Sequence, residues 1–217
     1  MINQNSPRTK DVPTQIKNQE LVDQRRLQIV DAAVRLFIEK GFHKTTTREI
    51  AQTAGISIGL LYEYVASKED VLYLVCEAIH AEVEHGVAEA LKKAKRGRDV
   101  LAEMIREYFL VCNRMSDHIL LIYQETRTLP QQWRKRVLEN EVKITGIFVE
   151  ALRHLIESGD LPHLDKHSIE LIAHNISVLG HMWTFRRWFL TRHYSIEEYI
   201  KLQTDFILGK STGKRSG

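Results

Sequence analysis

The stretch TTTREIAQTAGISIGLLYEYVASKEDVL, residues 45–72, decides the fold of this chain. Thr46 and Glu49 have the spacing of a capping box, in which a hydroxyl and a carboxylate satisfy the unpaired backbone N–H groups at a helix start. A short helix follows, and Gly55 permits a tight turn after it. Ser57 is placed to cap a second short helix. The stretch therefore predicts two short helices joined by a turn.

A pair of short helices joined by a glycine-containing turn is typical of a helix-turn-helix. The second helix of this motif fits the width of the DNA major groove. A plain helical hairpin would show the same capping and turn residues. The spacing alone leaves both interpretations open, and the flanking sequence has to separate them.

The sequence before this motif predicts an arm followed by one amphipathic helix. Residues 1–22 are polar and show no sustained period, so we expect a flexible arm. The basic residues Arg8, Lys10 and Lys17 of this arm could contact the DNA backbone, but a disordered tail is the favoured interpretation. From Asp23 onward, apolar residues recur at steps of three and four, which places them on one helix face. These residues are Leu27, Val30, Val34, Phe37 and Ile38.

The sequence behind the motif predicts helices throughout, with no convincing period-two strand. Ser67 and Asp70 are spaced as a further capping pair and begin a long helix that runs to about Lys95. Additional helices are expected over residues 99–115, 118–126, 131–158, 167–190 and 195–208. The predicted fold class is therefore all-α, and residues 209–217 form a disordered tail.

Composition excludes several classes of protein. Hydrophobic residues make up 43% and charged residues 27% of the 217, which is too apolar for a disordered chain. The two cysteines, Cys76 and Cys112, cannot form the disulfide framework of a small secreted module, so we expect a cytoplasmic protein. No apolar run is long enough to span a bilayer. A net charge of +3 permits nucleic-acid binding without requiring it.

Residues 25–72 resemble the signature of the tetracycline-repressor (TetR) family of transcriptional regulators. RRLQIVDAAVRLFIEKGF, residues 25–42, is similar to the family's first helix, and residues 45–72 are similar to its helix-turn-helix. The positions in family register are Gly55, Ser57, Leu61, Tyr62, Tyr64, Ser67, Lys68 and Glu69. The resemblance implies a three-helix helix-turn-helix head at the N-terminal end and a C-terminal helical body that binds a ligand and dimerises.

The resemblance also implies a division of the chain by function. It assigns residues 1–22 to a flexible arm, 23–70 to the helix-turn-helix DNA-binding domain, 71–208 to the ligand-binding and dimerisation domain, and 209–217 to a disordered tail. Such regulators bind double-stranded operator DNA as homodimers, with one head on each half of a near-palindromic site. We expect a repressor of this kind, without a cofactor, a metal ion or a membrane partner.

The family's DNA contacts fall, position by position, on the starts and outer faces of the predicted helices. They are Thr46, Thr47, Ser57, Ile58, Gly59, Leu60, Tyr62, Tyr64 and Lys68. Hydroxyls, N–H groups at helix starts and lysine are the usual contacts to phosphates, and Gly59 allows close approach of the backbone. Tyr62 and Tyr64 have core packing as their alternative, which the apolar neighbours of Tyr64 favour.

Three positions depart from the common family pattern. Ile58 is apolar where a residue often faces bases, Leu60 replaces a small hydroxyl residue, and Val65 replaces phenylalanine. Ile58 and Leu60 can pack against thymine methyl groups but cannot hydrogen-bond base edges. We therefore expect modest direct readout of bases and some reliance on DNA shape.

The resemblance places the dimer interface on the helices over residues 167–190 and 195–208. An apolar stripe on the first of these helices fits that role. It consists of Ile169, Ile172, Ile176, Leu179 and Trp183, with Met182, Phe185 and Phe189 beside it. A purely intramolecular core would show the same stripe.

A further resemblance concerns residues 122–141 and 181–200, which are similar to segments of TetR members that sense acyl-CoA thioesters. The expected effector is a small hydrophobic molecule, and this resemblance implies an acyl-CoA. Candidate ligand contacts are Tyr108, Phe109, Tyr123, Arg127, Trp133, Phe148, His174, Trp183, Arg186 and Arg187. The arginines among them, together with Arg134, would meet the CoA phosphates. Core packing is the alternative for the aromatic residues, and solvation or ion pairing for the arginines.

Other interpretations compete with this one. The chain lacks a Gly-x-Ser-x-Gly elbow, a phosphate-binding glycine loop and a His-Glu-x-x-His motif, so an enzyme is not favoured. A repressor of a drug-efflux gene that senses hydrophobic drugs, and a helical scaffold that binds only proteins, are alternatives. His167, His174 and His181 share one helix face, but successive histidines lie about 10 Å apart along it, too far to bind one metal ion.

Overall fold

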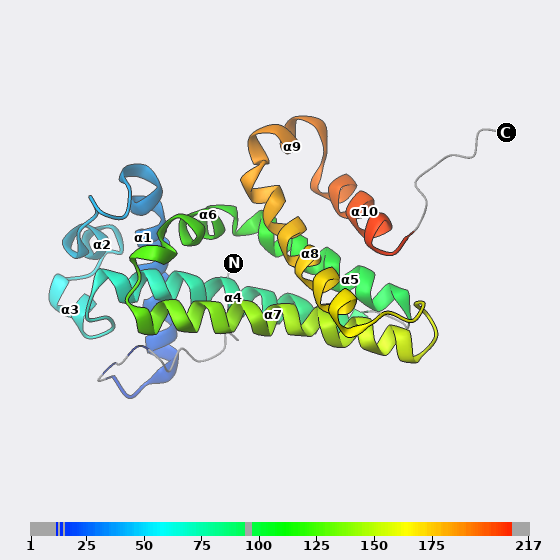
Figure 1. The fold of residues 1–217 in the computed structure, drawn as a ribbon. Coiled ribbons are helices and arrows are strands. Elements are labelled where there is room, and N and C mark those ends of the chain that lie inside the picture. The colour runs from blue at the N-terminus through cyan, green and yellow to red at the C-terminus, as the bar shows by residue number, and fades with distance from the viewer. Residues whose placement is uncertain (1–11, 13, 15, 94–96, 210–217) are drawn as a thin grey trace. The chain divides into compact units, whose positions relative to one another are not determined.

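The computed structural model describes residues 12, 14, 16–93 and 97–209. No strand occurs in this part of the chain, so the predicted all-α class is confirmed (Figure 1). None of its helices is both long enough and apolar enough to cross a membrane. The helices are α1 (Gln19–Lys40), α2 (Thr47–Thr53), α3 (Ile58–Tyr62), α4 (Lys68–Lys93), α5 (Arg98–Arg114), α6 (Ser116–Glu125), a 3-10 turn η1 (Thr126–Thr128), α7 (Gln131–Glu157), α8 (Lys166–Phe185), α9 (Arg187–His193) and α10 (Ile196–Ile207).

Two compact units are formed by alternating parts of the chain. The first unit comprises Met1–Glu82 and Asp117–Asn140, and the second comprises Val83–Ser116 and Glu141–Gly217. α4 and α7 each contribute residues to both units. The predicted division at residue 70, into a DNA-binding domain and a body, is one of function and stays a prediction.

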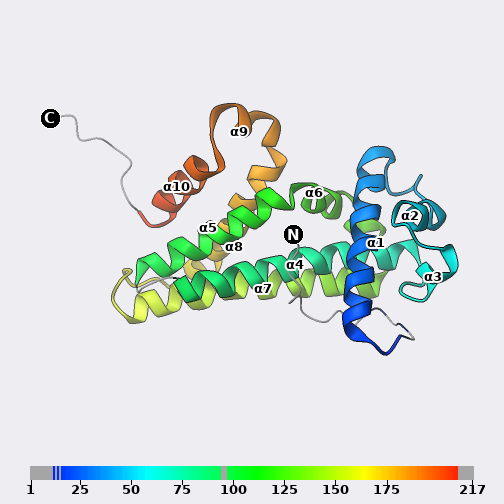
Figure 2. The ribbon, with the colours of Figure 1, turned by 180° about the vertical axis from the view of Figure 1, so that it is seen from behind.

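α1 packs against α2, and α2 against α3, in the first unit (Figures 1 and 2). The buried face of α1 includes Ile29, Ala33, Leu36 and Phe37, at the spacing of one helix face. Ile38, which the sequence analysis places on this face, is exposed. Each residue turns an α-helix by about 100°, so a face centred on residues 33, 36 and 37 directs residue 38 outward.

α1 begins at Gln19 rather than at Asp23. Asn18 caps the helix, because its side chain accepts a hydrogen bond from the Leu21 N–H (3.2 Å). Residues 19–22 of the predicted arm are therefore helical. An N-terminal cap of this kind stabilises a helix by about 1 kcal/mol, enough to extend it beyond its first apolar residue.

The segment before α1 is held to that helix at Val12. Arg26 is buried in α1 and donates a hydrogen bond to the Val12 carbonyl (2.5 Å). Among the basic residues of the predicted arm, Lys17 is exposed, whereas Arg8 and Lys10 lie outside the described residues. DNA contact by the arm therefore stays an untested alternative.

α5, α8 and α10 pack against one another in the second unit. Gly180 of α8 lies against α5, where an added Cβ would come within 2.6 Å of the Tyr108 ring and 2.9 Å of Cys112 Sγ. Glycine at this position lets the two helix backbones approach closely. The Tyr199 hydroxyl of α10 donates to the Leu179 carbonyl of α8 (2.7 Å). These contacts hold the three helices together as a core.

The predicted helix over residues 167–190 is two helices in the structure. α8 ends at Phe185, Arg186 has non-helical dihedral angles (φ −108°, ψ 17°), and α9 begins at Arg187. No proline or glycine lies between residues 181 and 195, so local signals could not predict this break. Its reason is tertiary, because the chain has to turn back for α10 to pack against α5 and α8 (Figure 1).

Candidate DNA-binding and ligand-binding sites

Capping side chains fix the two short helices α2 and α3. The Thr46 hydroxyl accepts from the Glu49 N–H (3.3 Å), and the Thr46 N–H donates to Glu49 Oε2 (2.8 Å), which completes the predicted capping box. Ser57 caps α3 by accepting from the Leu60 N–H (3.1 Å). Gly55 adopts a positive φ of 69° in the turn between the helices. The predicted pair of capped helices and its turn are confirmed.

A lysine from α1 reinforces the start of α2. Lys40 Nζ lies 2.6 Å from Glu49 Oε1, so the end of α1 is ion-paired to the capping box. The hydrogen bond from Lys40 is the main cause that lowers the pKa of Glu49 to about 2, and hydrogen bonds from Thr46 lower it further. Glu49 is therefore ionised at neutral pH and ties α2 to α1.

The outer surface of these helices presents hydroxyl groups. Tyr62 is 52% exposed, and its hydroxyl lies 3.0 Å from Thr47 Oγ1, so the last residue of α3 meets the first residue of α2. We call these two residues the hydroxyl pair. Leu61 is buried and anchors α3, while Ser57 and Gly59 are exposed beside the pair. Exposed hydroxyls and backbone N–H groups are suited to phosphate oxygens.

Gly59 has free space around its Cα. A Cβ at this position would meet no described neighbouring atom nearer than Ser57 Oγ, at 3.9 Å. The fold therefore does not require glycine here, whereas a backbone brought close to DNA would. Ile58 and Leu60, on either side, are half-buried, which limits the apolar surface that they offer to thymine methyl groups.

Two of the predicted DNA contacts face the protein. Tyr64 is buried and its carbonyl accepts a hydrogen bond from Arg26 (3.2 Å), in line with the core-packing alternative. Lys68 Nζ donates to the carbonyls of Phe42 (2.7 Å) and Thr45 (3.0 Å) and lies 4.3 Å from the Phe42 ring centroid. Lys68 thereby fixes the loop between α1 and α2, and a phosphate contact by this residue stays a prediction.

The predicted contacts omit two exposed cations, Lys44 and Arg48. Arg48 lies on the first turn of α2, next to Thr47, and Lys44 lies in the loop that Lys68 fixes. Ammonium and guanidinium groups in such places neutralise DNA phosphates and release counterions. The signal was available in the sequence, because both basic residues lie within two positions of the capping Thr46.

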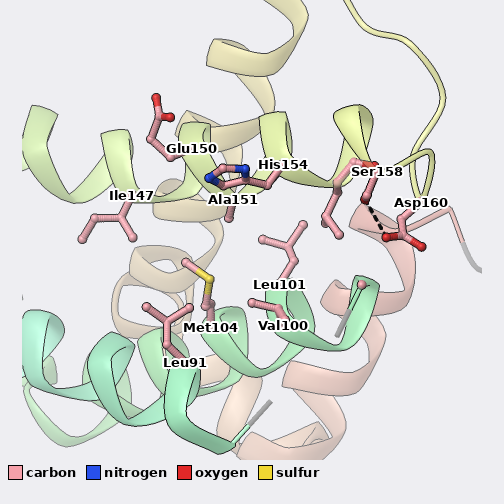
Figure 3. A pocket seen from close by; sticks show the side chains of 12 residues that line it. Leu91, Val100, Leu101, Met104, Ile147, Glu150, Ala151, His154, Ser158 and Asp160 are labelled. Atoms are coloured by element: carbon pink, nitrogen blue, oxygen red, sulfur yellow. Dashed lines mark hydrogen bonds between the residues drawn. The ribbon is translucent and has the colours of Figure 1, made fainter. Parts of the chain in front are cut away.

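The second unit contains a pocket of about 810 Å³, bordered by α4, α5 and α7 (Figure 3). Its polar residues lie along α7 and just beyond it, where Ser158 donates a hydrogen bond to Asp160 Oδ2 (2.7 Å), with Glu150 and His154 on the preceding turns. A mostly apolar pocket of this size suits a small hydrophobic molecule. The aliphatic lining residues are Leu91 of α4, Val100, Leu101 and Met104 of α5, and Ile147, Ala151 and Leu155 of α7.

Four predicted ligand contacts, by contrast, are buried in the core of the second unit. They are Tyr108, Phe109, Phe148 and Trp183. The Tyr108 hydroxyl lies 3.2 Å from Ser177 Oγ and 3.0 Å from His181 Nε2. Burial raises the pKa of Tyr108 well above its usual value, so the hydroxyl stays neutral. These residues lie outside the described lining of the pocket, and a ligand role for them stays a prediction.

The other predicted ligand contacts are also placed away from the described pocket lining. Trp133 is buried in the first unit, where its ring stacks on Tyr73 (centroids 4.3 Å apart) and its N–H donates to Asp70 (2.9 Å). The remaining candidates are exposed, and they are Tyr123, Arg127, His174, Arg186 and Arg187. The structure therefore does not gather the predicted set into one site.

The aliphatic pocket was not predicted from the sequence, because the predicted ligand contacts are aromatic and basic residues and its lining is mostly aliphatic. The apolar part of the pocket wall contributed by α7 consists of Ile147, Ala151 and Leu155, at steps of four residues along one helix face. A small Ala151 between two larger side chains leaves space on such a face. This spacing, set against the apolar positions of α5, is the sequence signal that could have indicated the pocket.

α8 and α10 carry apolar side chains on two faces. Ile169, Ile176 and Trp183, which the sequence analysis favours for a dimer interface, are buried within the second unit, so the intramolecular alternative is right for them. Other large apolar residues of these helices are exposed. They are Leu171, Val178 and Phe185 of α8, and Leu202 and Phe206 of α10. Where such side chains form a contiguous patch, they are typical of a protein-interaction surface.

The described part of the chain forms neither a metal centre nor a reactive thiol. No group of three or more His, Cys, Asp or Glu side chains there is placed to hold a metal ion. Cys76 and Cys112 are both buried, and burial raises the pKa of Cys112 to about 12. A buried, protonated thiol is chemically inert.

Two family models match the chain. The model for bacterial regulatory proteins of the tetR family matches residues 29–73. The model for the tetracyclin repressor-like C-terminal domain matches residues 94–209, which is more than half of the 217 residues. Together the two matches span the helix-turn-helix and most of the second unit.

Similar proteins agree with these models. The transcriptional regulator BetI of Rhizobium meliloti is 34% identical over 186 residues, which cover 84% of this chain and 87% of BetI. The fatty acid metabolism regulator protein of Bacillus subtilis is 28% identical over 141 residues, 62% of this chain and 70% of that protein. The crystal structure of AibR with isovaleryl coenzyme A and operator DNA shares the fold, with a TM-score of 0.68, 20% identity, and 84% and 97% of the two chains covered.

The family matches and the geometry lead to the same conclusion. The matched N-terminal model covers the capped helices that present the hydroxyl pair, and the C-terminal model covers α5 and α7, two of the three helices that border the pocket. The chain therefore belongs to the TetR family of bacterial regulatory proteins, as a DNA-binding transcriptional regulator and not an enzyme.

Proposed function

We propose that this regulator is a cytoplasmic repressor that binds a near-palindromic DNA operator as a homodimer and is released by a small hydrophobic effector. Residues 23–70 then form the DNA-binding domain, and residues 71–208 the ligand-binding and dimerisation domain. The observation that carries the proposal is the exposed hydroxyl pair, beside the unobstructed backbone of Gly59. A core role would bury these hydroxyls, whereas phosphate contact requires them at the surface.

In this proposal, hydroxyls and cations around α2 and α3 hold the DNA backbone. Thr47 and Tyr62 face one phosphate together, since their hydroxyls already lie within hydrogen-bond distance of each other. Lys44 and Arg48 neutralise neighbouring phosphates, which makes the affinity depend on salt concentration. Ser57 adds an exposed hydroxyl at the start of α3. Base readout is left mainly to the shape of the DNA.

Replacing Tyr62 with phenylalanine tests the hydroxyl pair, because the change removes one hydroxyl and keeps the ring. We expect DNA affinity to fall about tenfold, or ~1.4 kcal/mol, while dimerisation is unchanged. Tyr123→Phe is the matched control, since Tyr123 of α6 is 53% exposed and should not affect binding. The measurement is a gel shift, at several salt concentrations, on DNA that flanks the chain's own gene. If the wild-type protein forms no salt-sensitive, sequence-preferring complex, the proposed function is wrong.

The exposed apolar residues of α8 and α10 support the homodimer. Leu171 and Val178 are seven residues apart on α8, and Leu202 and Phe206 are four apart on α10, so each pair shares a helix face. A second copy of the chain, related by a two-fold axis, would cover these faces with the same faces of its own. Burial of such side chains is the main driving force of obligate association.

The aliphatic pocket supports a hydrophobic effector. Its volume of about 810 Å³ is ample for an acyl chain with part of its head group. An acyl thioester is the first candidate, because similar proteins include a fatty acid metabolism regulator and a regulator solved with isovaleryl coenzyme A. In this assignment the CoA phosphates lie outside the pocket, since the described lining contains no lysine or arginine. The arginines expected from the sequence to meet them do not border it.

An uncharged hydrophobic drug is the second candidate effector. Glu150 and Asp160 favour it, because carboxylates at the pocket border repel an anionic ligand. Thermal shift with octanoyl-CoA, octanoate and octanol separates the two, since a ligand that binds only the folded protein raises its melting temperature. Ala151→Trp fills the pocket and should abolish the shift. A shift that survives this substitution would place the effector elsewhere.

Release from DNA then requires that the effector binds more tightly to a conformation of the dimer that does not bind DNA than to the conformation that does. α4 begins at Lys68, beside the helix-turn-helix, and contributes Leu91 to the pocket near its other end. An effector that shifts α4 changes the separation of the two heads in the dimer. DNA affinity falls only as far as the effector prefers the non-binding state.

A further inference from the structure

Asp70 joins the start of α4 to α7. Its Oδ2 accepts hydrogen bonds from the N–H groups of Ala66 (2.9 Å) and Ser67 (3.0 Å), which caps α4. Its Oδ1 accepts a hydrogen bond from Nε1 of Trp133 (2.9 Å), on the first turn of α7. Asp70 is buried, so water competes little for these bonds. Hydrogen bonds to a carboxylate are stronger than those between neutral groups, and here they bind both helices to one side chain.

Trp133 also holds α4 through the face of its ring. The indole stacks on the ring of Tyr73, with centroids 4.3 Å apart and planes inclined by 15°. Tyr73 is fully buried and lies one helical turn after Asp70. Trp133 therefore contacts two successive turns at the start of α4, one through its N–H and one through its ring. Such a double contact leaves the first turns of α4 little freedom to move relative to α7.

The first turn of α4 in turn holds the loop that leads into α2. Lys68 lies on that turn and donates to the carbonyls of Phe42 (2.7 Å) and Thr45 (3.0 Å). Thr45 leads directly into the N-cap of α2. α2 carries Thr47, whose hydroxyl lies 3.0 Å from that of Tyr62. A displacement at the start of α4 is therefore passed to the hydroxyl pair through Lys68.

We propose that Trp133 is a positioning residue for the DNA-binding surface, through which α7 regulates operator affinity. This inference rests on the proposed function, because it assumes that the hydroxyl pair contacts DNA. α7 is one continuous helix, Gln131–Glu157, and its later residues Ile147 and Ala151 line the ligand pocket. A ligand that displaces α7 acts on Trp133, and through Asp70 on the helix-turn-helix, in addition to its action through α4.

Trp183 provides the comparison for a purely structural role. Its Nε1 donates to Asn113 Oδ1 (2.7 Å), and its side chain is 2% exposed, against 7% for Trp133. Both residues of this contact belong to the second unit, on α8 and α5. Loss of the N–H donor should lower stability at both tryptophans, and more at Trp133, whose acceptor is a carboxylate. Only Trp133 is bonded to the cap of α4.

The decisive experiment compares Trp133→Phe with Trp183→Phe in the full chain, because phenylalanine keeps a ring and removes the N–H donor. DNA affinity is measured by fluorescence anisotropy on a duplex that the wild-type protein enriches from a random pool, after titration of the active fraction. We expect W133F to weaken binding about tenfold, or ~1.4 kcal/mol, and W183F to change it less than about twofold. The melting temperatures of both variants should fall, so a loss of stability is common to the two variants whereas the loss of DNA affinity is specific to W133F.

Hydrogen exchange gives a readout that needs no DNA. If Trp133 positions the helix-turn-helix, amides of residues 44–48 and 66–69 exchange faster in W133F than in W183F. A purely structural Trp133 would change exchange at residues 131–137 alone. Asp70→Asn keeps an oxygen for the cap of α4 and presents an amide N–H to Trp133, so it should reproduce the loss of affinity. The double variant with W133F should not add to that loss, because both changes remove the same bond.

Equal DNA affinities for W133F and the wild-type protein would overturn the inference. So would an equal loss in W133F and W183F, since that result indicates a general effect of stability. If the wild-type protein enriches no duplex, the proposed function fails instead, and exchange at residues 44–48 then decides whether Trp133 positions the head. If W133F does not fold, Asp70→Asn answers the same question.

Discussion

The short helix α3 and the long helix α8 are held in place by different interactions. α3 has five residues, a serine cap and one buried side chain, Leu61, and its outer face presents a tyrosine hydroxyl and a bare glycine. α8 has twenty residues, buries apolar side chains along one face and exposes others, such as Leu171, on another. A helix specified by caps can keep its outer face polar. A helix specified by packing has apolar residues left over for a partner.

The apolar outer faces of α8 and α10 contrast most with the polar outer face of α3. Phe206→Asp should abolish the dimerisation that we propose for them. Phe206 is 76% exposed, so a charge there should leave the fold of one copy intact and oppose its burial against a second copy. We expect monomers in sedimentation velocity and a fall in DNA affinity of about a hundredfold, because linked heads bind by avidity. Leu138→Asp on α7, at a residue 57% exposed, is the matched control. A variant that stays dimeric would show that these faces serve another purpose.

On α3, Gly59→Ala should move stability and DNA binding in opposite directions. Alanine fits the space around Gly59 and favours a helix by up to about 1 kcal/mol, so the melting temperature should rise. The added methyl group should hold the backbone away from DNA and lower affinity about tenfold, or ~1.4 kcal/mol. Gly146→Ala on α7, where a Cβ meets nothing within 4 Å, should stabilise without changing DNA affinity. Unchanged affinity in G59A would mean that this backbone does not approach DNA.

The smallest expected effect is a difference in the pH dependence of stability between the capping boxes of α2 and α10. The pKa of Glu49 is lowered to about 2 by Lys40 and Thr46, whereas the pKa of Glu198 is lowered by hydrogen bonds from Ser195 alone. A lowered pKa in the folded state adds stability that is fully present above the usual value of 4.5 and is lost as the pH falls through the folded value.

This difference in pKa predicts different acid responses for two glutamine variants. The difference in free energy of unfolding between the wild-type protein and Glu49→Gln should narrow as the pH falls from about 4.5 to about 2. The difference for Glu198→Gln should also narrow as the pH falls below about 4.5, and by less, because hydrogen bonds from Ser195 alone lower the pKa of Glu198. The measurement is urea unfolding at a series of pH values. A difference for Glu49→Gln that stays constant with pH would contradict the assigned role of its carboxylate.

The contrast between the helices explains what could be predicted from the sequence. The caps and turn of α2 and α3 depend on residues three or four positions apart, such as Thr46 with Glu49 and Ser57 with Leu60. Local spacing therefore predicted them. The acceptors of Lys68 lie 23 and 26 residues away, so no local pattern indicated that its amine faces carbonyls.

The features of the second unit that were missed depend on contacts between distant segments. The break at Arg186 follows from the packing of α10 on α5 and α8. Ile169 and Ile176 are buried in the core of their own unit. The sequence could not predict this, because an apolar stripe on a helix fits a dimer interface and an intramolecular core equally well. The pocket borders the small Ala151 of α7 and is lined by residues of three helices. Its existence depends on how these helices pack, which the sequence does not show directly.

Because α4 and α7 contribute residues to both units, the proposed DNA-binding domain cannot be separated from the proposed ligand-binding domain without cutting these helices. A fragment that stops before residue 117 would lose Trp133, and with it the bond that steadies Asp70. Grafting this head onto another protein would therefore require residues 117–140 to be carried along. Unfolding of either unit would also disrupt α4 and α7, which the other unit shares. The chain should therefore unfold in a single cooperative transition.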